Sequence, residues 1–277
     1  MDLSPPQQVG WSGTPVDAST AETVFLDIEG ISKTYPARDG NPVHALERIS
    51  CTIRTGEFAS ILGPSGCGKS TLLLIIAGLV APTAGRLRFR GGQAGGAPDF
   101  GIVFQDPVLF PWRDVQANVE LPAEITGMRR DARAETARRL LALVGLQGFE
   151  RKFPYELSGG MQQRVAIARA LMLSPSLLLM DEPFGALDAM TREQMNLELQ
   201  KISMATRATV VFVTHSIAEA VFLSDRVMVM SGRPATLKEV VEIDIPRPRS
   251  LEMMASPRFG NLVGHLRALL GSTTDPT

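Results

Sequence analysis

The sequence lacks both a disulfide framework and an excess of charge of either sign. Its two cysteines, Cys51 and Cys67, are too few for a disulfide-rich secreted domain, and their spacing does not suggest a zinc site. Its 28 basic and 29 acidic residues give a net charge of −1, so the overall balance provides no electrostatic attraction to nucleic acid or anionic lipid. We therefore expect a reducing compartment and no nucleic-acid partner.

Long hydrophobic runs are also absent. The most apolar run, residues 72–81, is interrupted by Gly78 and is far shorter than the roughly 20 residues that span a bilayer. The first residues are polar and rich in Pro, Ser and Thr, unlike a signal peptide, and residues 1–23 are predicted to be a disordered leader. We expect a protein that is soluble by itself and reaches a membrane only through a partner.

Short apolar runs and helical stretches alternate along most of the chain. Two β-rich runs, VFLDIEGI and LERISCTI, open the pattern and suggest antiparallel strands, and EFASIL then leads through a glycine-rich loop into an apolar helix. Further short apolar runs occupy residues 176–180, 208–213 and 225–230. This alternation predicts an α/β domain over residues 24–245, with a parallel sheet covered on both faces.

Two segments depart from this alternation. Helical patterns replace the β-like runs between residues 106 and 158, which predicts a helical insert. Its arginines are interpreted as a solvated helix face rather than a nucleic-acid stripe, because no aromatic residues are interleaved with them. Residues 246–277 are predicted to form a C-terminal tail with a short amphipathic helix that packs back on the core.

A glycine-rich loop carries the strongest chemical signal. Residues 63–70 read GPSGCGKS and match the pattern G-x-x-x-x-G-K-[ST] between a predicted strand and a predicted helix. In such a loop backbone N–H groups point at phosphate oxygens, Lys69 adds a charge near the β/γ-phosphates, and Ser70 can ligate Mg²⁺. The predicted phosphate-binding residues are Gly63, Pro64, Ser65, Gly66, Cys67, Gly68, Lys69, Ser70 and Thr71. Cys67 is interpreted as a small filler, and the alternative is a reactive thiol with a lowered pKa.

A pair of acidic residues supplies the partner that such a loop requires. Asp181 ends the hydrophobic run LLLM, where its carboxylate is expected to face Mg²⁺. Glu182 follows it and could orient or deprotonate a water for attack on the γ-phosphate. Acidic pairs often cap helices, but the buried strand before this pair and the phosphate loop upstream favour the catalytic interpretation.

The segment LSGGMQQR, residues 157–164, resembles the signature motif of the ATP-binding-cassette (ABC) ATPases, and the resemblance covers residues 24–245. An ordinary capped helix would explain Ser158 but not the two glycines, each of which costs about 1 kcal/mol in a helix. The resemblance implies a head-to-tail dimer with two ATP molecules, in which Ser158, Gly159, Gly160 and Gln162 of one protomer contact the nucleotide held by the other. The implied fold is the P-loop NTPase ABC cassette, with a RecA-like core, an antiparallel β subdomain and a helical insert.

Four further positions match the family. Gln105 resembles the glutamine that contacts Mg²⁺ and the attacking water, and Asp188 lies in ALD, which resembles the loop along the dimer seam. His215 resembles the switch histidine at the γ-phosphate; a lone His is more often structural, but its place directly after a buried strand favours this role. Tyr35 matches the aromatic residue that stacks on adenine, although aromatic residues are common in β-loops.

The same resemblance implies an ATPase subunit bound at the cytoplasmic face of the inner membrane. Its implied partners are transmembrane permease subunits, a second copy of itself and, indirectly, a substrate-binding protein. Leu109, Phe110 and Trp112 are expected to be exposed where a permease helix docks, with packing inside the insert as the alternative. Three local segments, PVLFPWRDVQANVELP, PFGALDAMTRE and EIDIPRPR, look most like the ATPases of nitrate, sulfonate and taurine importers. Import of another solute, export and a non-transport ATPase remain alternatives.

Overall fold

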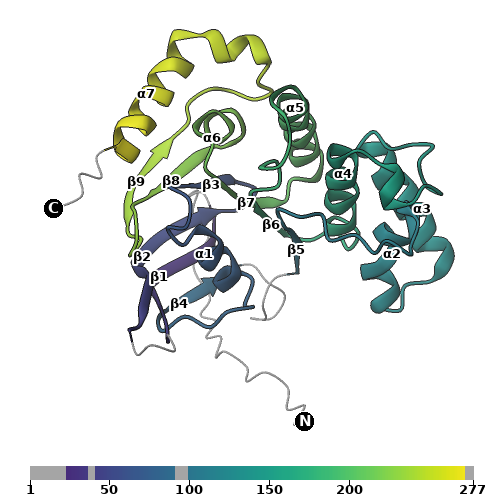
Figure 1. Ribbon diagram of the computed structural model, residues 1–277, viewed down its shortest axis with the longest axis horizontal. Coiled ribbons are helices and arrows are strands. Elements are labelled where there is room, and N and C mark those ends of the chain that lie inside the picture. The colour runs from purple at the N-terminus through teal and green to yellow at the C-terminus, as the bar shows by residue number, and fades with distance from the viewer. Residues whose placement is uncertain (1–22, 37–40, 91–98, 272–277) are drawn as a thin grey trace.

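A three-stranded antiparallel sheet forms one side of the computed structural model, which describes residues 23–36, 41–90 and 99–271 (Figure 1). Its strands lie in the order β2-β1-β4, with the bounds Val24–Tyr35 for β1, Val43–Arg54 for β2 and Ala84–Phe89 for β4. This sheet confirms the antiparallel opening. All but the last residue of the predicted disordered leader lies outside the described residues.

A second sheet of six strands has the order β5-β6-β7-β3-β8-β9. Every residue of β3 and β7 is buried, and both strands are rich in Val, Ile, Leu and Phe, because the sheet is covered on both faces. The strands from β5 to β8 are parallel, as predicted, whereas β9 pairs antiparallel with β8 at the edge. The bounds are Phe58–Leu62 (β3), Phe100–Val103 (β5), Leu177–Asp181 (β6), Thr209–Thr214 (β7), Arg226–Met230 (β8) and Leu237–Glu242 (β9).

The two faces of the six-stranded sheet belong to two separate apolar cores. Leu177 and Leu179 of β6 pack with α1 and the antiparallel sheet, whereas Leu178 and Met180 pack with the helices of the opposite face. This alternation follows from the two-residue period of side chains along a strand. Helix α1 spans Lys69–Ile76, and the opposite face is covered by α5 (Ala189–Thr206), α6 (Ile217–Leu223) and α7 (Pro257–Gly271).

Three helices form the end of the molecule that lies beside β5 and β6 (Figure 1). Helices α2 (Val115–Ile125) and α3 (Arg130–Leu143) fall within the predicted insert, and α4 (Gly159–Ala170), which follows a short 3₁₀ turn at Pro154–Glu156, packs against both. We call this set the helical end. Gly101 of β5 has no room for a side chain, because a Cβ there would lie 2.4 Å from the Ala170 carbonyl oxygen. The limits 106–158 stay a prediction.

The C-terminal segment packs against the core through α7, where Phe259 and Leu266 are buried. A short 3₁₀ helix at Leu251–Ala255 precedes it. Arg249 is 2% exposed and donates hydrogen bonds to the carbonyl oxygens of Val221 and Ile245, both at 2.7 Å, which ties the segment to the end of α6. Within the described ranges, no helix combines the length and apolar character needed to span a membrane.

Candidate functional site

The predicted chemical residues meet at the carboxyl ends of three neighbouring strands. Leu62, the last residue of β3, pairs with Thr214 of β7, and Asp181 of β6 pairs with Val213. The phosphate loop, the acidic pair and His215 follow these three strand ends, so the parallel order of β6, β7 and β3 brings them together. Ligands of open α/β sheets bind at this edge.

The phosphate loop wraps around the side chain of Lys69. The Lys69 ammonium is buried and donates hydrogen bonds to the carbonyl oxygens of Gly63 and Pro64, both at 3.0 Å. Gly68 has a φ of +126°, and a Cβ there would lie 2.9 Å from the Ala45 carbonyl oxygen, so this position requires glycine. Helix α1 begins at Lys69 after the N-cap Gly68, which makes no side-chain capping hydrogen bond. The start of a helix directs backbone N–H groups toward a bound anion.

Ser70 and Asp181 form an oxygen-rich pair beside the loop. The Ser70 hydroxyl donates to Asp181 Oδ1 at 2.9 Å. Burial raises the pKa of Asp181, and the Ser70 hydrogen bond opposes this shift. Hydroxyl and carboxylate oxygens are suitable Mg²⁺ ligands. The described residues contain no group of three or more His, Cys, Asp or Glu able to hold a metal by themselves.

Glu182 lies between a cation and an imidazole. Its Oε2 is 2.7 Å from His215 Nδ1, and its Oε1 is 3.4 Å from Lys69 Nζ. The backbone of Glu182 is left-handed, with a φ of +43°, and its N–H donates to the Val213 carbonyl oxygen at 2.9 Å. Non-glycine residues rarely adopt this conformation, and those that do are found more often at functional sites. Glu182 thus stands where Lys69 and His215 also converge.

Gln105 and Tyr35 lie nearer the margins of the site. Gln105 follows β5 and is exposed, and its Nε2 lies 3.4 Å from the position that a Cβ on Gly185 would take, three residues after Glu182. Tyr35 ends β1 and is half-buried, with Lys33 Nζ 4.9 Å from its ring centroid. The metal contact of Gln105 and the adenine contact of Tyr35 stay predictions.

Cys67 is a buried filler of the phosphate loop, as the sequence indicates. Its side chain is 2% exposed, and burial raises its pKa despite the nearby charge of Lys69. A Cβ added to Gly63 would lie 3.0 Å from the Cys67 sulfur, which shows how tightly the thiol fits. The alternative of a lowered pKa is therefore wrong, because burial outweighs the cation.

The signature segment begins a helix as predicted. Ser158 is the N-cap of α4, and its hydroxyl accepts from the Met161 N–H at 3.3 Å. A Cβ on Gly160 would lie 2.9 Å from Thr191 Cγ2 of α5, so glycine permits the close approach of these two helices. Across the described chain, no hydrogen bond or ion pair joins Ser158, Gly159 or Gly160 to the phosphate loop.

Two other predicted nucleotide contacts have local structural roles. Asp188 caps α5, accepting from the Thr191 N–H at 3.0 Å and the Thr191 hydroxyl at 2.6 Å. The Gln162 amide donates to the carbonyl oxygens of Pro154 and Leu157. Their nucleotide contacts across a dimer stay predictions. Thr71 follows Ser70 in the first turn of α1 and is half-buried.

Arg233 is a site residue that the sequence analysis did not identify. It lies between β8 and β9, and its Nη2 donates to the carbonyl oxygen of Gly66 in the phosphate loop at 2.6 Å. Because β8 is the neighbour of β3 in the sheet, the residues after β8 reach the loop that follows β3. The turn residues SGRP after the run DRVMVM were the available signal.

The aromatic segment after Gln105 is only partly exposed. Trp112 is 72% exposed, as expected, but Leu109 and Phe110 are half-buried. Leu109 packs against the core, and Asn118 fixes Phe110 by accepting from its N–H at 2.8 Å and donating to its carbonyl oxygen at 3.1 Å. The expectation that all three are exposed is therefore wrong for Leu109 and Phe110.

Comparisons with known proteins agree with this geometry. Residues 46–185 match the family model described as ABC transporter. The taurine import ATP-binding protein TauB of Rhizobium johnstonii is 48% identical over 260 residues, which cover 91% of this chain and 98% of that protein. The nitrate import ATP-binding protein NrtC of Synechococcus elongatus is 43% identical over 88% of this chain and 38% of its own length.

Solved structures show the same fold. The ATP-binding cassette MJ0796, in a dimeric post-hydrolysis state bound to ADP and Pi, is 33% identical and superposes with a TM-score of 0.69, covering 80% of this chain and all of that one. The α/β cassette fold implied by the resemblance is thereby confirmed. The chain belongs to the ATP-binding subunits of ABC transporters and is an ATPase.

Proposed function

We propose that this chain drives the import of a small oxyanion or a related small organic solute by binding and hydrolysing ATP. The observation that carries the ATP-hydrolysing role is the convergence of Lys69, Glu182 and His215 at the ends of three adjacent parallel strands. A buried cation, a carboxylate and an imidazole within hydrogen-bonding or ion-pair distance are the groups that phosphoryl transfer to water requires.

The nucleotide would lie along the phosphate loop. Backbone N–H groups within residues 63–71, except Pro64, which has none, would bind its phosphates together with Lys69. Tyr35 would stack on the adenine. Ser70, Asp181 and Gln105 would hold Mg²⁺, which neutralises phosphate charge when bound. These oxygen donors fit a magnesium ion that keeps some ligands from water and phosphate.

Glu182 would orient the attacking water at the γ-phosphate, and His215 would hold both Glu182 and the phosphate. The Nδ1 of His215 already contacts the carboxylate, which leaves the second ring nitrogen for another partner. A carboxylate positioned in this way contributes by binding and polarising the water, so its loss should affect turnover more than nucleotide binding.

Hydrolysis would take place in a head-to-tail pair of this chain. Ser158, Gly159, Gly160 and Gln162 at the start of α4 would contact the nucleotide of the other copy, and Asp188 would lie along the seam. The start of α4 exposes Ser158 and Gly159 and offers helix N–H groups for an anion. Dimeric forms of the similar cassette MJ0796 support this arrangement.

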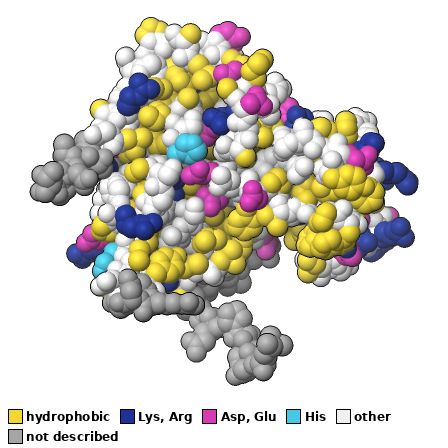
Figure 2. All heavy atoms as spheres, viewed as in Figure 1, with side chains coloured by type: hydrophobic (Ala, Val, Ile, Leu, Met, Phe, Trp, Pro, Cys, Tyr) yellow, Lys and Arg dark blue, Asp and Glu magenta, His cyan; other side chains and the backbone are white. Residues whose placement is uncertain are grey.

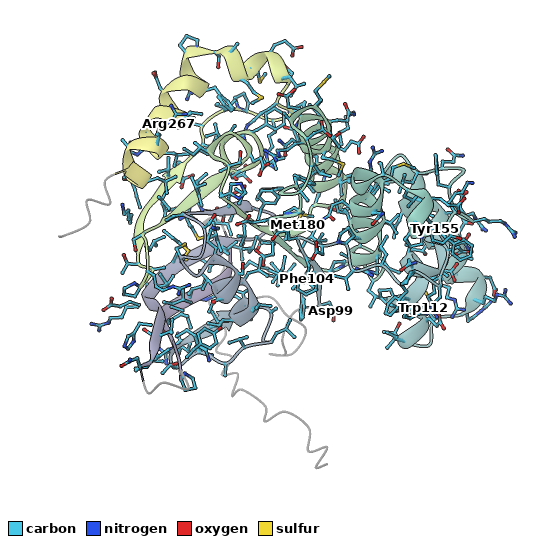
Figure 3. The ribbon with its side chains drawn as sticks, viewed as in Figure 1. Asp99, Phe104, Trp112, Tyr155, Met180 and Arg267 are labelled. Atoms are coloured by element: carbon cyan, nitrogen blue, oxygen red, sulfur yellow. The ribbon has the colours of Figure 1, made fainter. Side chains whose placement is uncertain are left out.

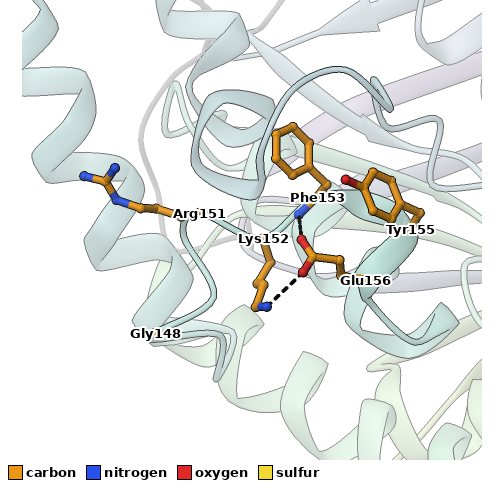
Figure 4. A pocket seen from close by; sticks show the side chains of 6 residues that line it. All are labelled: Gly148, Arg151, Lys152, Phe153, Tyr155 and Glu156. Atoms are coloured by element: carbon orange, nitrogen blue, oxygen red, sulfur yellow. Dashed lines mark hydrogen bonds and ion pairs between the residues drawn. The ribbon is translucent and has the colours of Figure 1, made fainter.

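Transmembrane permease subunits would dock on the helical end, and the chain would thereby sit at the cytoplasmic face of the membrane. Figure 2 shows hydrophobic side chains gathered over this end, and Figure 3 places Trp112 and Tyr155 there. Tyr155 is 76% exposed and stacks on Phe153 with ring centroids 5.7 Å apart (Figure 4). Exposed aromatic side chains of this kind commonly anchor protein partners. A substrate-binding protein would act through the permease.

The names of the relatives support the proposed solute class, because they are ATP-binding proteins of taurine import, nitrate import and bicarbonate transport. The test is uptake by a host strain that lacks this chain and carries a plasmid copy of wild type or Glu182→Gln. We expect loss of growth on taurine, an alkanesulfonate or nitrate as sole sulfur or nitrogen source, or loss of bicarbonate uptake, with rescue by wild type alone. Normal uptake of all of these, together with a defect for a sugar or peptide, would reject the solute class.

A further inference from the structure

We propose that the ion pair between Arg192 and Glu219 is a brace that holds Glu182 and His215 in contact. Neither residue touches the phosphate loop or the Glu182 carboxylate through a hydrogen bond or ion pair in the described chain. Both are therefore positioning residues. The inference rests on the proposed roles of Glu182 and His215 in ATP hydrolysis.

Arg192 holds the segment that follows Glu182. From the first turn of α5, its guanidinium donates through Nε to the Phe184 carbonyl oxygen at 3.3 Å and through Nη2 to the Leu187 carbonyl oxygen at 2.9 Å. The same segment is a tight turn, in which the Gly185 N–H donates to the carbonyl oxygen of Glu182 at 3.0 Å. The rigid fork of Arg192 thus fixes the turn whose first residue is Glu182.

Glu219 holds the residues on both sides of His215. Its Oε2 accepts from the Thr214 hydroxyl at 2.5 Å, and the same hydroxyl oxygen accepts from the Ser216 N–H at 2.9 Å. The Ser216 hydroxyl in turn accepts from the backbone N–H of Glu219 at 3.4 Å. The backbone on each side of His215 is therefore tied to one carboxylate on α6.

The two halves meet where Arg192 Nε lies 3.4 Å from Glu219 Oε1. Glu219 is 6% exposed, and burial raises its pKa while the Thr214 hydrogen bond and the charge of Arg192 oppose the shift. Burying a carboxylate this deeply costs free energy unless a charged or hydrogen-bonding partner compensates it. The Arg192–Glu219 ion pair thus connects the turn that begins at Glu182 to the segment that carries His215.

The experiment compares Glu219→Gln, Arg192→Gln and Arg192→Lys with a matched control, Glu120→Gln. Glu120 forms an ion pair with Arg133 at 3.0 Å between α2 and α3, at comparable burial but away from the site. We expect Glu219→Gln and Arg192→Gln to lower kcat roughly tenfold while the Kd for ATP changes less than about twofold. Arg192→Lys should retain more activity than Arg192→Gln, because it keeps the charge without the fork. Glu120→Gln should leave kcat near wild type.

A double-variant cycle with His215→Ala separates this brace from general damage. If Glu219 acts through His215, the variant His215→Ala/Glu219→Gln should turn over no more slowly than His215→Ala alone. Additive losses, or a Glu219→Gln kcat equal to that of Glu120→Gln, would overturn the brace. Wild-type turnover by both Glu182→Gln and His215→Ala would instead reject the proposed catalytic roles. Arg192→Lys keeps the test decisive if a Glu219 variant does not fold.

Discussion

The imidazole of His215 lies 2.7 Å from the carboxylate of Glu182, although the two residues are 33 positions apart in the chain. Their strands, β6 and β7, are parallel neighbours in register, with Asp181 opposite Val213. The residues that follow the two strand ends must therefore lie close together, and the Glu182 carboxylate also lies 3.4 Å from Lys69 Nζ.

We predict that Glu182→Gln binds ATP normally and loses turnover by roughly 10²-fold or more, because it loses the water-orienting carboxylate while the phosphate loop is unchanged. ATP should then hold two copies together. Size-exclusion chromatography with Mg-ATP measures this association. A Glu182→Gln protein that stays monomeric at every concentration would count against the shared dimeric site.

Lys69→Ala should weaken ATP binding, which Glu182→Gln is expected to spare. It removes the ammonium held against the carbonyl oxygens of Gly63 and Pro64, and with it the cation expected beside several phosphate charges. ATP affinity itself should therefore fall, as measured by isothermal titration. Glu120→Gln, on the helical end, serves as the control with unchanged affinity. An ATP Kd for Lys69→Ala equal to that of wild type would contradict the proposed loop.

Much of this site could be predicted because its residues sit in short segments with a specific order. The pattern from Gly63 to Ser70 and the acidic pair after an apolar run identify the strand ends, and the parallel order of strands then brings them together. Asp188 has a local role that its motif does not indicate. It is expected at a dimer seam, and in the structure it caps the start of α5.

Such patterns do not predict side-chain contacts between segments that are far apart in the sequence. No local sequence motif predicts the contacts made by Arg233, Arg192 and Glu219. These contacts depend on which strands and helices become neighbours in the fold. Exposure is equally hard to predict from a local segment. Tertiary packing buries the thiol of Cys67, as its interpretation as a filler implies, but it also half-buries Leu109 and Phe110, which are expected to be exposed.

Asp181→Asn should stabilise the ligand-free protein at neutral pH. Burial raises the pKa of Asp181 above its unfolded value, so this acid contributes stability below the unfolded pKa and loses it as the pH rises through the folded pKa. Removing the charge should therefore raise Tm near pH 7.5, and the gain should shrink toward pH 4. Differential scanning calorimetry at several pH values measures both effects. A lower Tm for Asp181→Asn near pH 7.5 would show that the charge is favourable.

Both thiols should react slowly with alkylating or disulfide reagents in the folded protein. Burial raises the pKa of Cys51 to about 12 and that of Cys67 above its usual value, and only a thiolate attacks such reagents rapidly. Labelling by a chromogenic disulfide should be slow in buffer and complete in denaturant. Cys51→Ser and Cys67→Ser identify the contribution of each thiol. Fast stoichiometric labelling of the native protein at neutral pH would contradict the burial of the loop thiol.

Arg233→Gln should weaken ATP binding moderately, by roughly threefold to tenfold in Kd, because one hydrogen bond from a charged donor contributes about 1.5–3 kcal/mol at most and this one is exposed. The guanidinium supports the Gly66 carbonyl oxygen and so the shape of the phosphate loop, and its charge lies beside that loop.

Arg233→Lys keeps the charge and separates the two contributions. An ATP affinity near wild type would assign the effect to charge, and a loss like that of Arg233→Gln would assign it to loop geometry. Arg258→Gln is the matched control, because it breaks an exposed ion pair with Asp244 that is remote in sequence from the loop. Equal ATP affinities for Arg233→Gln, Arg258→Gln and wild type would show that Arg233 contributes nothing to the nucleotide site.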